Sequence, residues 1–222
     1  MLASCTFFVA GDACIKALGQ SMPLGEILLL RGCVSAPIVV IMAARAGVLS
    51  ALPKAARNPL AIARTLLEVI LVMLFLLGIL NMGYANAVGI QQSLPLVAMA
   101  GAALFLGEEV GWRRWLAAAI GFVGVMVIIQ PGAGALNWPA LAILGSVLAT
   151  AVRDLITRGL TAALPSLVLT TLSVISVGLS GLLLLAIEAW KVPDGRELAL
   201  VTLAALCAIG GFYFMIEAFR RG

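Results

Sequence analysis

The sequence predicts an all-α membrane protein, a polytopic bundle of transmembrane helices. Of its 222 residues, 63% are hydrophobic and only 11% are charged, and the mean hydropathy is +1.17. Soluble domains average about 25% charged residues, so a soluble globular fold is excluded. The basic residues lie mostly between eight long apolar runs, where they act as determinants of membrane topology. The net charge of +4 therefore does not indicate a nucleic-acid partner.

Each apolar run is a candidate membrane span, because a helix needs about 20 apolar residues to cross a bilayer core of about 30 Å. The eight runs cover approximately residues 2–19, 25–44, 65–82, 85–106, 113–130, 138–159, 165–187 and 198–219. A short charged corner, residues 107–114, joins the fourth run to the fifth in a membrane hairpin. Pro95 lies within the fourth run and removes one backbone hydrogen bond, which suits a hinge or a solute contact.

The basic residues alternate between the connections. The second, fourth and sixth connections and the C-terminal end carry Arg45, Lys54, Arg57, Arg64, Arg113, Arg114, Arg158, Arg220 and Arg221. The third connection, near Gly83, and the fifth, residues 131–137, contain no lysine or arginine, and the seventh carries Lys191 and Arg196. Because positively charged loops stay in the cytoplasm, this pattern predicts a cytoplasmic N-terminus.

Three features of the fourth and fifth runs resemble a known family. They are Pro95, the corner Leu106-Gly107-Glu108 and the pattern Gly121-Phe122-Val123-Gly124-Val125. In this order and spacing they resemble the EamA-like family of the drug/metabolite transporter superfamily, and the resemblance extends over nearly the whole chain. It implies ten helices and the transport of small organic compounds. We therefore expect the chain to be truncated before its last two helices; an unusual member with eight helices is the alternative.

An internal repeat is visible in the sequence. A shift of 142 positions superimposes Asp12 on Asp154, Lys16 on Arg158 and Pro23 on Pro165, and a shift of 140 places Gly78 on Ala218. The first and sixth spans thus correspond, as do the third and eighth. Five spans separate the copies, so the second copy is inverted, a plan that recurs in secondary transporters. The predicted domains are a first repeat, residues 1–130 with helices one to five, and an incomplete second repeat, residues 138–222 with helices six to eight.

Charged residues inside the spans are candidates for solute binding or gating: Asp12, Lys16, Arg31, Asp154 and Arg158. Asp12 and Lys16 are four residues apart, so they share one face of a helix and can pair; Asp154 and Arg158 repeat this arrangement. A structural ion pair and a role in solute binding both remain open. Arg31 lies deep enough in the second span to require a carboxylate, a carbonyl or water, and we expect it to pair with Asp12.

A neutral polar cluster precedes Pro95 in the fourth span: Asn86, Gln91, Gln92 and Ser93. Gln91 and Gln92 are adjacent and point about 100° apart on a helix, so only one of them can face a narrow cavity. Interhelical hydrogen bonds are the alternative role for each residue. Glu26, Glu68 and Glu217 lie near the ends of their spans, and we assign them to the solvated membrane interface.

These observations favour a secondary transporter, importer or exporter, that carries a small organic metabolite by alternating access. The sequence has no histidine, which is the commonest metal ligand and a common general base, so we expect no metal, no cofactor and no enzyme activity. Two alternatives are a non-transporting membrane subunit or inactive fragment, and an intramembrane aspartyl enzyme built on Asp12 and Asp154. The expected surroundings are the cytoplasmic (inner) membrane and a small-molecule solute, without nucleic acid; a homodimer remains open.

Overall fold

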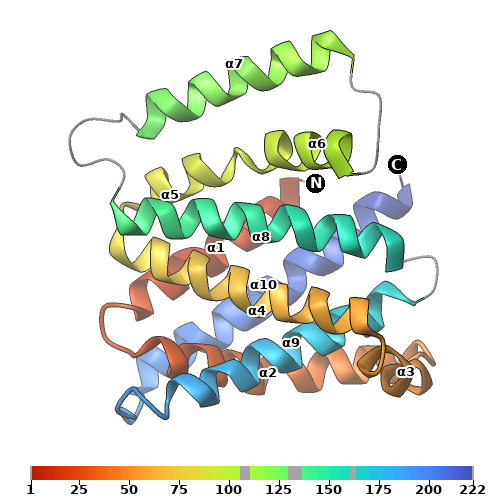
Figure 1. Cartoon of the computed structure of the whole chain (residues 1–222). Helices are drawn as coiled ribbons and strands as arrows, with labels where there is room; N and C mark the ends of the chain where they lie inside the picture. Colours follow the sequence, from red (N-terminus) through yellow and green to blue (C-terminus); the bar gives the residue numbers. More distant parts are fainter. Residues whose placement is uncertain (1, 106–110, 130–136, 161–163, 222) are drawn as a thin grey trace. The chain divides into compact units, whose positions relative to one another are not determined.

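The computed structural model describes residues 2–105, 111–129, 137–160 and 164–221, and within these residues it contains helices and no strand (Figure 1). The helices are α1 (Leu2–Leu18), α2 (Leu24–Arg45), α3 (Leu52–Ala56), α4 (Pro59–Asn81), α5 (Tyr84–Gln91), α6 (Leu94–Phe105), α7 (Trp112–Ile129), α8 (Trp138–Leu160), α9 (Ser166–Leu184) and α10 (Gly195–Arg221), with a 3₁₀ turn, η1 (Leu49–Ala51), before α3. This confirms the all-α fold. Residues 107–110 of the charged corner lie outside the described residues, as do residues 131–136 of the fifth connection.

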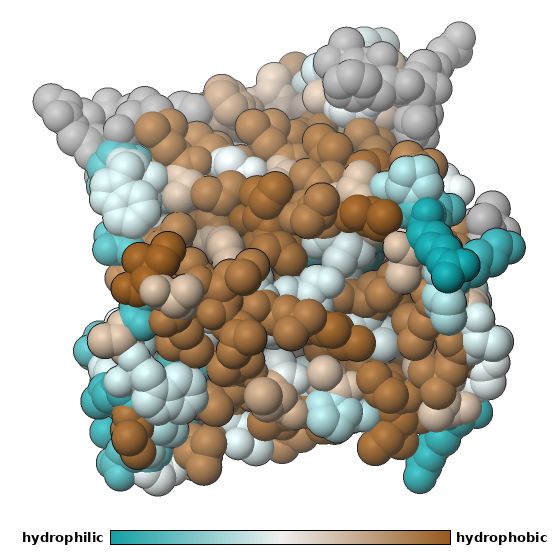
Figure 2. All heavy atoms as spheres, turned by 60° about the horizontal axis from the view of Figure 1, so that its bottom comes forward, coloured by the Kyte–Doolittle hydropathy of each residue, from teal (hydrophilic) through white to brown (hydrophobic). Residues whose placement is uncertain are grey.

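The helices have the composition of a polytopic membrane bundle. Among the described residues, α2, α4, α8 and α9 are long and apolar enough to cross a membrane. The other four predicted spans coincide with α1, with α5 and α6 together, with α7 and with α10. Figure 2 shows a face on which hydrophobic residues dominate, while hydrophilic residues gather at its left and right margins. A surface this rich in hydrophobic side chains suits contact with lipid better than contact with water.

The chain forms two compact units. The first unit contains residues 1–52 and 167–222, and therefore α1, α2, α9 and α10; the second contains residues 53–166, and therefore α4 to α8. In the first unit α10 packs along α1 and α2, and in the second unit α8 packs along α4 and α6. Each unit combines helices from both predicted repeats. The repeat itself, with its boundaries at residues 130 and 138, stays a prediction.

Local sequence signals explain where two long helices begin. The side chain of Asn58 accepts hydrogen bonds from the backbone N–H groups of Leu60 and Ala61 at 2.9 and 3.4 Å, and Pro59 occupies the first turn of α4. Asn137 accepts a hydrogen bond from the backbone of Ala140 at 3.3 Å at the start of α8. Asparagine caps satisfy N–H groups that have no partner within the helix, and a proline in the first turn needs no hydrogen bond.

The fourth predicted span is two helices rather than one. α5 ends at Gln91 and α6 begins at Leu94, with Gln92 and Ser93 between them in a turn. Pro95 therefore lies in the first turn of α6, where its missing N–H costs little. The carbonyl of Ile90 at the break accepts hydrogen bonds from the backbone N–H of Ser93 at 2.9 Å and from its hydroxyl at 2.6 Å. The prediction of one continuous span over residues 85–106 was wrong at this point.

Glycines bring α2 and α9 of the first unit into close contact. A Cβ atom added to Gly32 would lie 2.5 Å from the Cα atom of Gly178, and one added to Gly181 would lie 2.5 Å from the carbonyl oxygen of Gly25. Both distances are shorter than any real contact, so side chains at these positions would push the two helices apart. Small residues at helix contacts are the usual means of close packing in membranes.

Candidate functional site

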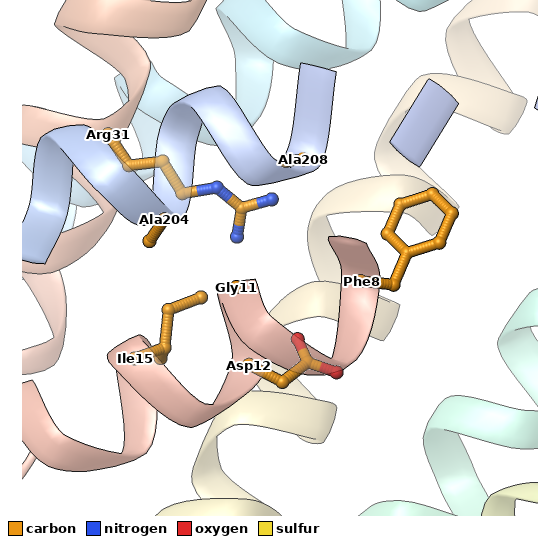
Figure 3. Close-up of a pocket in the computed structure, with 7 residues that line it drawn as sticks. All are labelled: Phe8, Gly11, Asp12, Ile15, Arg31, Ala204 and Ala208. Carbon is orange, nitrogen blue, oxygen red and sulfur yellow. The ribbon is translucent and has the colours of Figure 1, made fainter. Parts of the chain in front are cut away.

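A small pocket lies in the first unit between α1, α2 and α10. It is lined by Phe8, Gly11, Asp12, Ile15, Arg31, Ala204 and Ala208 (Figure 3). The cavity measures about 20 Å³, which is enough for about one water molecule. Two of the residues predicted from the sequence, Asp12 and Arg31, therefore come together at one pocket from two different helices.

The pocket exists because small residues stand where α1 faces α10. A Cβ atom added to Gly11 would lie 3.4 Å from the Cβ atom of Cys207 and 3.5 Å from the carbonyl oxygen of Ala204, so the two backbones approach closely here. Ala204 and Ala208 are buried in the same contact. Their methyl groups leave space that longer side chains would fill.

Arg31 enters the pocket from α2, seven residues after the first residue of that helix, which is about 10 Å along the axis. Figure 3 shows its guanidinium group directed towards α1 near Gly11, and the carboxylate of Asp12 beside the part of α1 that carries Phe8. Both charged side chains are half-buried. The pairing of Arg31 with Asp12 stays a prediction.

A charged network lies in the second unit between α4 and α8. Arg153 donates to both carboxylate oxygens of Glu68 at 3.1 Å and to Oδ1 of Asp154 at 2.6 and 2.9 Å. Arg64 lies 3.6 Å from Glu68 and donates to the hydroxyl of Thr157 at 3.1 Å. Two guanidinium groups and two carboxylates thus neutralise one another between the helices. Asp154 belongs to this network together with residues that were not predicted to be site residues.

The network corrects two interpretations of the sequence. Glu68 was assigned to the solvated interface, but its side chain is only 14% exposed and is bound by Arg153. Arg64 was assigned to the second connection, but it lies within α4 and is buried. Their i, i+4 spacing in an apolar helix was the available signal, because such a pair shares one face. The partner that buries them, Arg153, is 85 residues away from Glu68 in the chain.

A second charged cluster joins the start of α2 to the segment between α9 and α10. Glu26 is fully buried, and its Oε2 atom accepts a hydrogen bond from the backbone of Lys191 at 3.2 Å. Its Oε1 atom has no hydrogen-bond partner among the described residues. Glu188 accepts a hydrogen bond from the backbone of Gly25 at 2.7 Å. The assignment of Glu26 to the solvated interface was therefore wrong, because this loop covers it.

Lys191 and Glu197 belong to the same charged cluster in the first unit. The amino group of Lys191 lies 3.2 Å from Oε1 of Glu197 and donates to the carbonyl of Ser21 at 2.9 Å. The backbone N–H of Asp194 donates to Glu197 at 2.8 Å. This hydrogen bond, followed by contributions from Ser21 and Lys191, lowers the pKa of Glu197 from 4.5 to about 2. Glu197 stands in the first turn of α10, where a carboxylate is also favoured by the helix N-terminus.

The other predicted site residues are not among those that line the pocket. Asn86 and Gln92 are exposed, and Gln91 is half-buried at the end of α5. Lys16 and Arg158 stand in the last turns of α1 and α8, half-buried and exposed respectively. Ser93 is the buried member of the polar cluster. The proposed roles of these residues in solute binding remain predictions.

Comparison with known proteins decides the family. The sequence pattern of the EamA-like transporter family matches residues 1–130, which is more than half of the chain. The chain belongs to the EamA-like transporter family. This confirms the resemblance that Pro95 and the following hairpin indicated. The family is one of transporters, and the comparisons give no support to an enzyme.

Several similar proteins have been named for what they carry. The chain is 38% identical over 135 residues to a riboflavin transporter of Rhizobium johnstonii, covering 60% of this chain and 44% of that protein. It is 31% identical over 121 residues to a riboflavin transporter of Vibrio cholerae, covering 54% and 40%. It is 23% identical over 217 residues to an S-adenosylmethionine uptake transporter of Rickettsia conorii, covering 95% and 70%. The matches to the two riboflavin transporters thus span less than half of those proteins. No solved structure matches the chain.

The described residues offer no metal site to this EamA-like protein. No group of three or more cysteine, aspartate or glutamate side chains is placed there to hold an ion. What the pocket offers instead is one carboxylate and one guanidinium group at a cavity inside a helical bundle. Such a pair can hold a polar solute by charge and by hydrogen bonds.

Proposed function

We propose that this chain carries out the uptake of a small organic metabolite by alternating access. Its membership of a transporter family carries the proposal, and the pocket between α1, α2 and α10 supplies a place where a polar solute can bind. The names of the relatives support a small metabolite as the solute and uptake as the direction. Asp12 and Arg31 are the residues expected to contact it.

The proposal includes a location and an orientation. The chain spans the cytoplasmic membrane several times, with its N-terminus in the cytoplasm, as the distribution of basic residues favours. The cluster of Glu26, Lys191 and Glu197 then faces the external side. A second copy of the chain is the protein partner to be tested by cross-linking in membranes, and nucleic acid plays no part.

Flux into proteoliposomes tests the proposal. Purified protein is reconstituted, and the entry of radiolabelled riboflavin and S-adenosylmethionine is compared with that into empty vesicles. We expect saturable entry of at least one of the two compounds. Asp12→Asn removes the pocket's carboxylate and should reduce flux about tenfold or more, because hydrogen bonds to charged groups contribute about 1.5–3 kcal/mol.

The matched control is Asp194→Asn, the same chemical change at an exposed aspartate between α9 and α10. Its flux should equal that of the unchanged chain. Equal flux in all three proteins would remove Asp12 from the mechanism. No flux of either compound through correctly inserted protein would support a subunit or fragment that does not transport.

A further inference from the structure

The segment that joins α9 to α10 lies across the ends of the three helices that line the pocket. We call this segment, residues 185–194, the strap. Its Glu188 contacts the start of α2, and its Lys191 contacts Ser21, in the turn after α1, and Glu197, in the first turn of α10. All of these residues belong to the first unit. Figure 1 shows the strap at the lower left of the view, beside the turn between α1 and α2.

The strap and the pocket follow one another along the same helices. On α2, Arg31 of the pocket comes five residues after Glu26, which the strap covers, and on α10, Ala204 of the pocket comes seven residues after Glu197. At 1.5 Å per residue these separations are about 7.5 Å and about 10.5 Å. The strap therefore lies over the end of this helix group that the proposed orientation places outside.

A layer of apolar side chains separates the strap from the pocket. Leu18 of α1, Ile27 of α2 and Val201 of α10 occupy the positions between them along the three helices, and each is only 1% exposed. The pocket is therefore closed towards the strap in this structure. Access from this end requires the three helix ends to separate, and the strap ties these ends together.

The strap supplies a cap that α2 lacks. Pro23, the N-cap residue of α2, makes no side-chain hydrogen bond to the helix. Glu188 of the strap instead accepts a hydrogen bond from the backbone N–H of Gly25 at 2.7 Å. In return, Glu26 accepts one from the backbone N–H of Lys191 at 3.2 Å. When the strap leaves, both N–H groups lose these partners and must bind water instead.

Two features favour release of the strap. Three of its large apolar side chains are mostly exposed: Ile187 (88%), Trp190 (51%) and Val192 (80%). Segments with few buried apolar contacts open locally at a low cost in free energy. In addition, Oε1 of Glu26 is buried and has no hydrogen-bond partner among the described residues. Opening admits water to this atom, and a buried polar atom without a partner destabilises the closed state.

Building on the proposed transport function, we propose that the strap is the external gate of the pocket, and that Glu188 and Lys191 are the residues that latch it. With the latch formed, the ends of α1, α2 and α10 are held together over the apolar layer. With the latch broken, the strap moves away, the layer opens and the solute reaches the pocket. Segments that close over a site and open again are a common means of controlling access. This latch consists of a few polar contacts, so it can form and break within a transport cycle.

Labelling of a buried cysteine measures the opening of the gate. In a chain whose native cysteines are replaced by alanine, Val201→Cys places one thiol in the apolar layer, where it is protected while the gate is closed. A small thiol reagent is added to both sides of vesicles that contain the full chain, so the result does not depend on the orientation of the protein. The labelling rate then follows the fraction of molecules in which the gate is open.

Two substitutions break the latch. Glu188→Ala removes the carboxylate that caps α2, and Lys191→Met removes the ammonium group that contacts Ser21 and Glu197. Each should raise the labelling rate about tenfold or more, because hydrogen bonds of charged groups are the strong ones. The matched control is Arg196→Met, which removes a positive charge in the same way at an exposed position of α10. It should leave the labelling rate unchanged.

Hydrogen exchange of the unchanged chain tests the gate without any substitution. The backbone N–H groups of Gly25 and Lys191 are both bonded across the closed strap, so one opening should expose both. We expect the two groups to be protected to a similar degree, and about tenfold or more weakly than the N–H groups in the middle of α2. Protection as strong as that in the middle of α2 would overturn the gate, and so would the absence of any protection at Gly25.

The outcomes separate this inference from the proposed function. Equal labelling rates with and without the latch, in variants that thermal melting shows to be folded, would overturn the gate, and flux in the same chain would leave transport standing. Faster labelling of the latch variants without flux of either metabolite of the flux assay would support the gate and overturn transport. A rate raised equally by Arg196→Met would show that charge, and not the latch, controls opening, and would also overturn the assignment.

Discussion

At the scale of single residues, the cost of an intramembrane charge depends on what it contacts. Glu68 is held by Arg153 through both carboxylate oxygens, and its side chain is 14% exposed. Removing it would take from two guanidinium groups the carboxylate that they share, and loss of a buried ion pair in a bundle is expensive. Glu68 therefore stabilises the contact between α4 and α8.

Replacing Glu68 by glutamine should lower the free energy of unfolding by about 1–3 kcal/mol. Arg153→Gln should have a similar effect, and the double variant should lose less than the sum, because both single changes remove the same ion pair. Thermal melting in detergent measures all three. Asp154→Asn, whose side chain is 45% exposed, is the control and should cost less; additive losses would mean that Glu68 and Arg153 do not interact.

At the scale of helices, hydrophobic runs predicted the elements well because a membrane span is a local property of about 20 residues. The break between α5 and α6 was not predicted, because Pro95 indicated a kink and not a two-residue turn at Gln92 and Ser93. Burial of Glu26 depends on Lys191, 165 residues away. Such burial cannot be derived from the local sequence.

The candidate site, like the helices, could be predicted from the sequence only in part. Asp12 and Arg31 were predicted as site residues because a charged side chain inside a membrane span needs a charged partner, a carbonyl group or water. The pocket that these two residues line was not predicted. It depends on Ala204 and Ala208, which look like ordinary packing residues until α10 is placed against α1. Glu68 was not predicted to be part of a charged network, because its position near the end of a span indicated a solvent-exposed side chain.

Close packing of α2 and α9 gives a prediction at this scale. Gly32→Ala should destabilise the first unit by about 1–3 kcal/mol, as overpacking does, because the new methyl group would lie 2.5 Å from Gly178. Gly159→Ala in α8 is the matched control, since no atom of the described residues lies within 4 Å of its added Cβ atom. It should be neutral or slightly stabilising through helix propensity. Equal melting temperatures of the two variants would show that α2 and α9 are not in contact.

At the scale of the whole molecule, the predicted repeat relates two helix pairs that differ in what lies between their helices. α1 with α10 holds a cavity, and α8 with α4 holds a closed charged network. An inverted repeat places related sites in opposite orientations. Each helix pair contains one helix from each predicted repeat: the pair of α8 and α4 is closed by its own charged side chains, and the pair of α1 and α10 keeps a cavity.

The orientation of that site in the membrane is the last prediction. In a variant without native cysteines, one cysteine is placed at Asp194, in the loop beside the cluster of Lys191 and Glu197, or at Arg57, between α3 and α4. A membrane-impermeant maleimide should label Asp194→Cys in intact cells and Arg57→Cys only after permeabilisation, because basic connections remain in the cytoplasm. The reverse pattern would invert the proposed topology, and labelling of both in intact cells would show that α4 and its neighbours do not separate the two loops by a membrane.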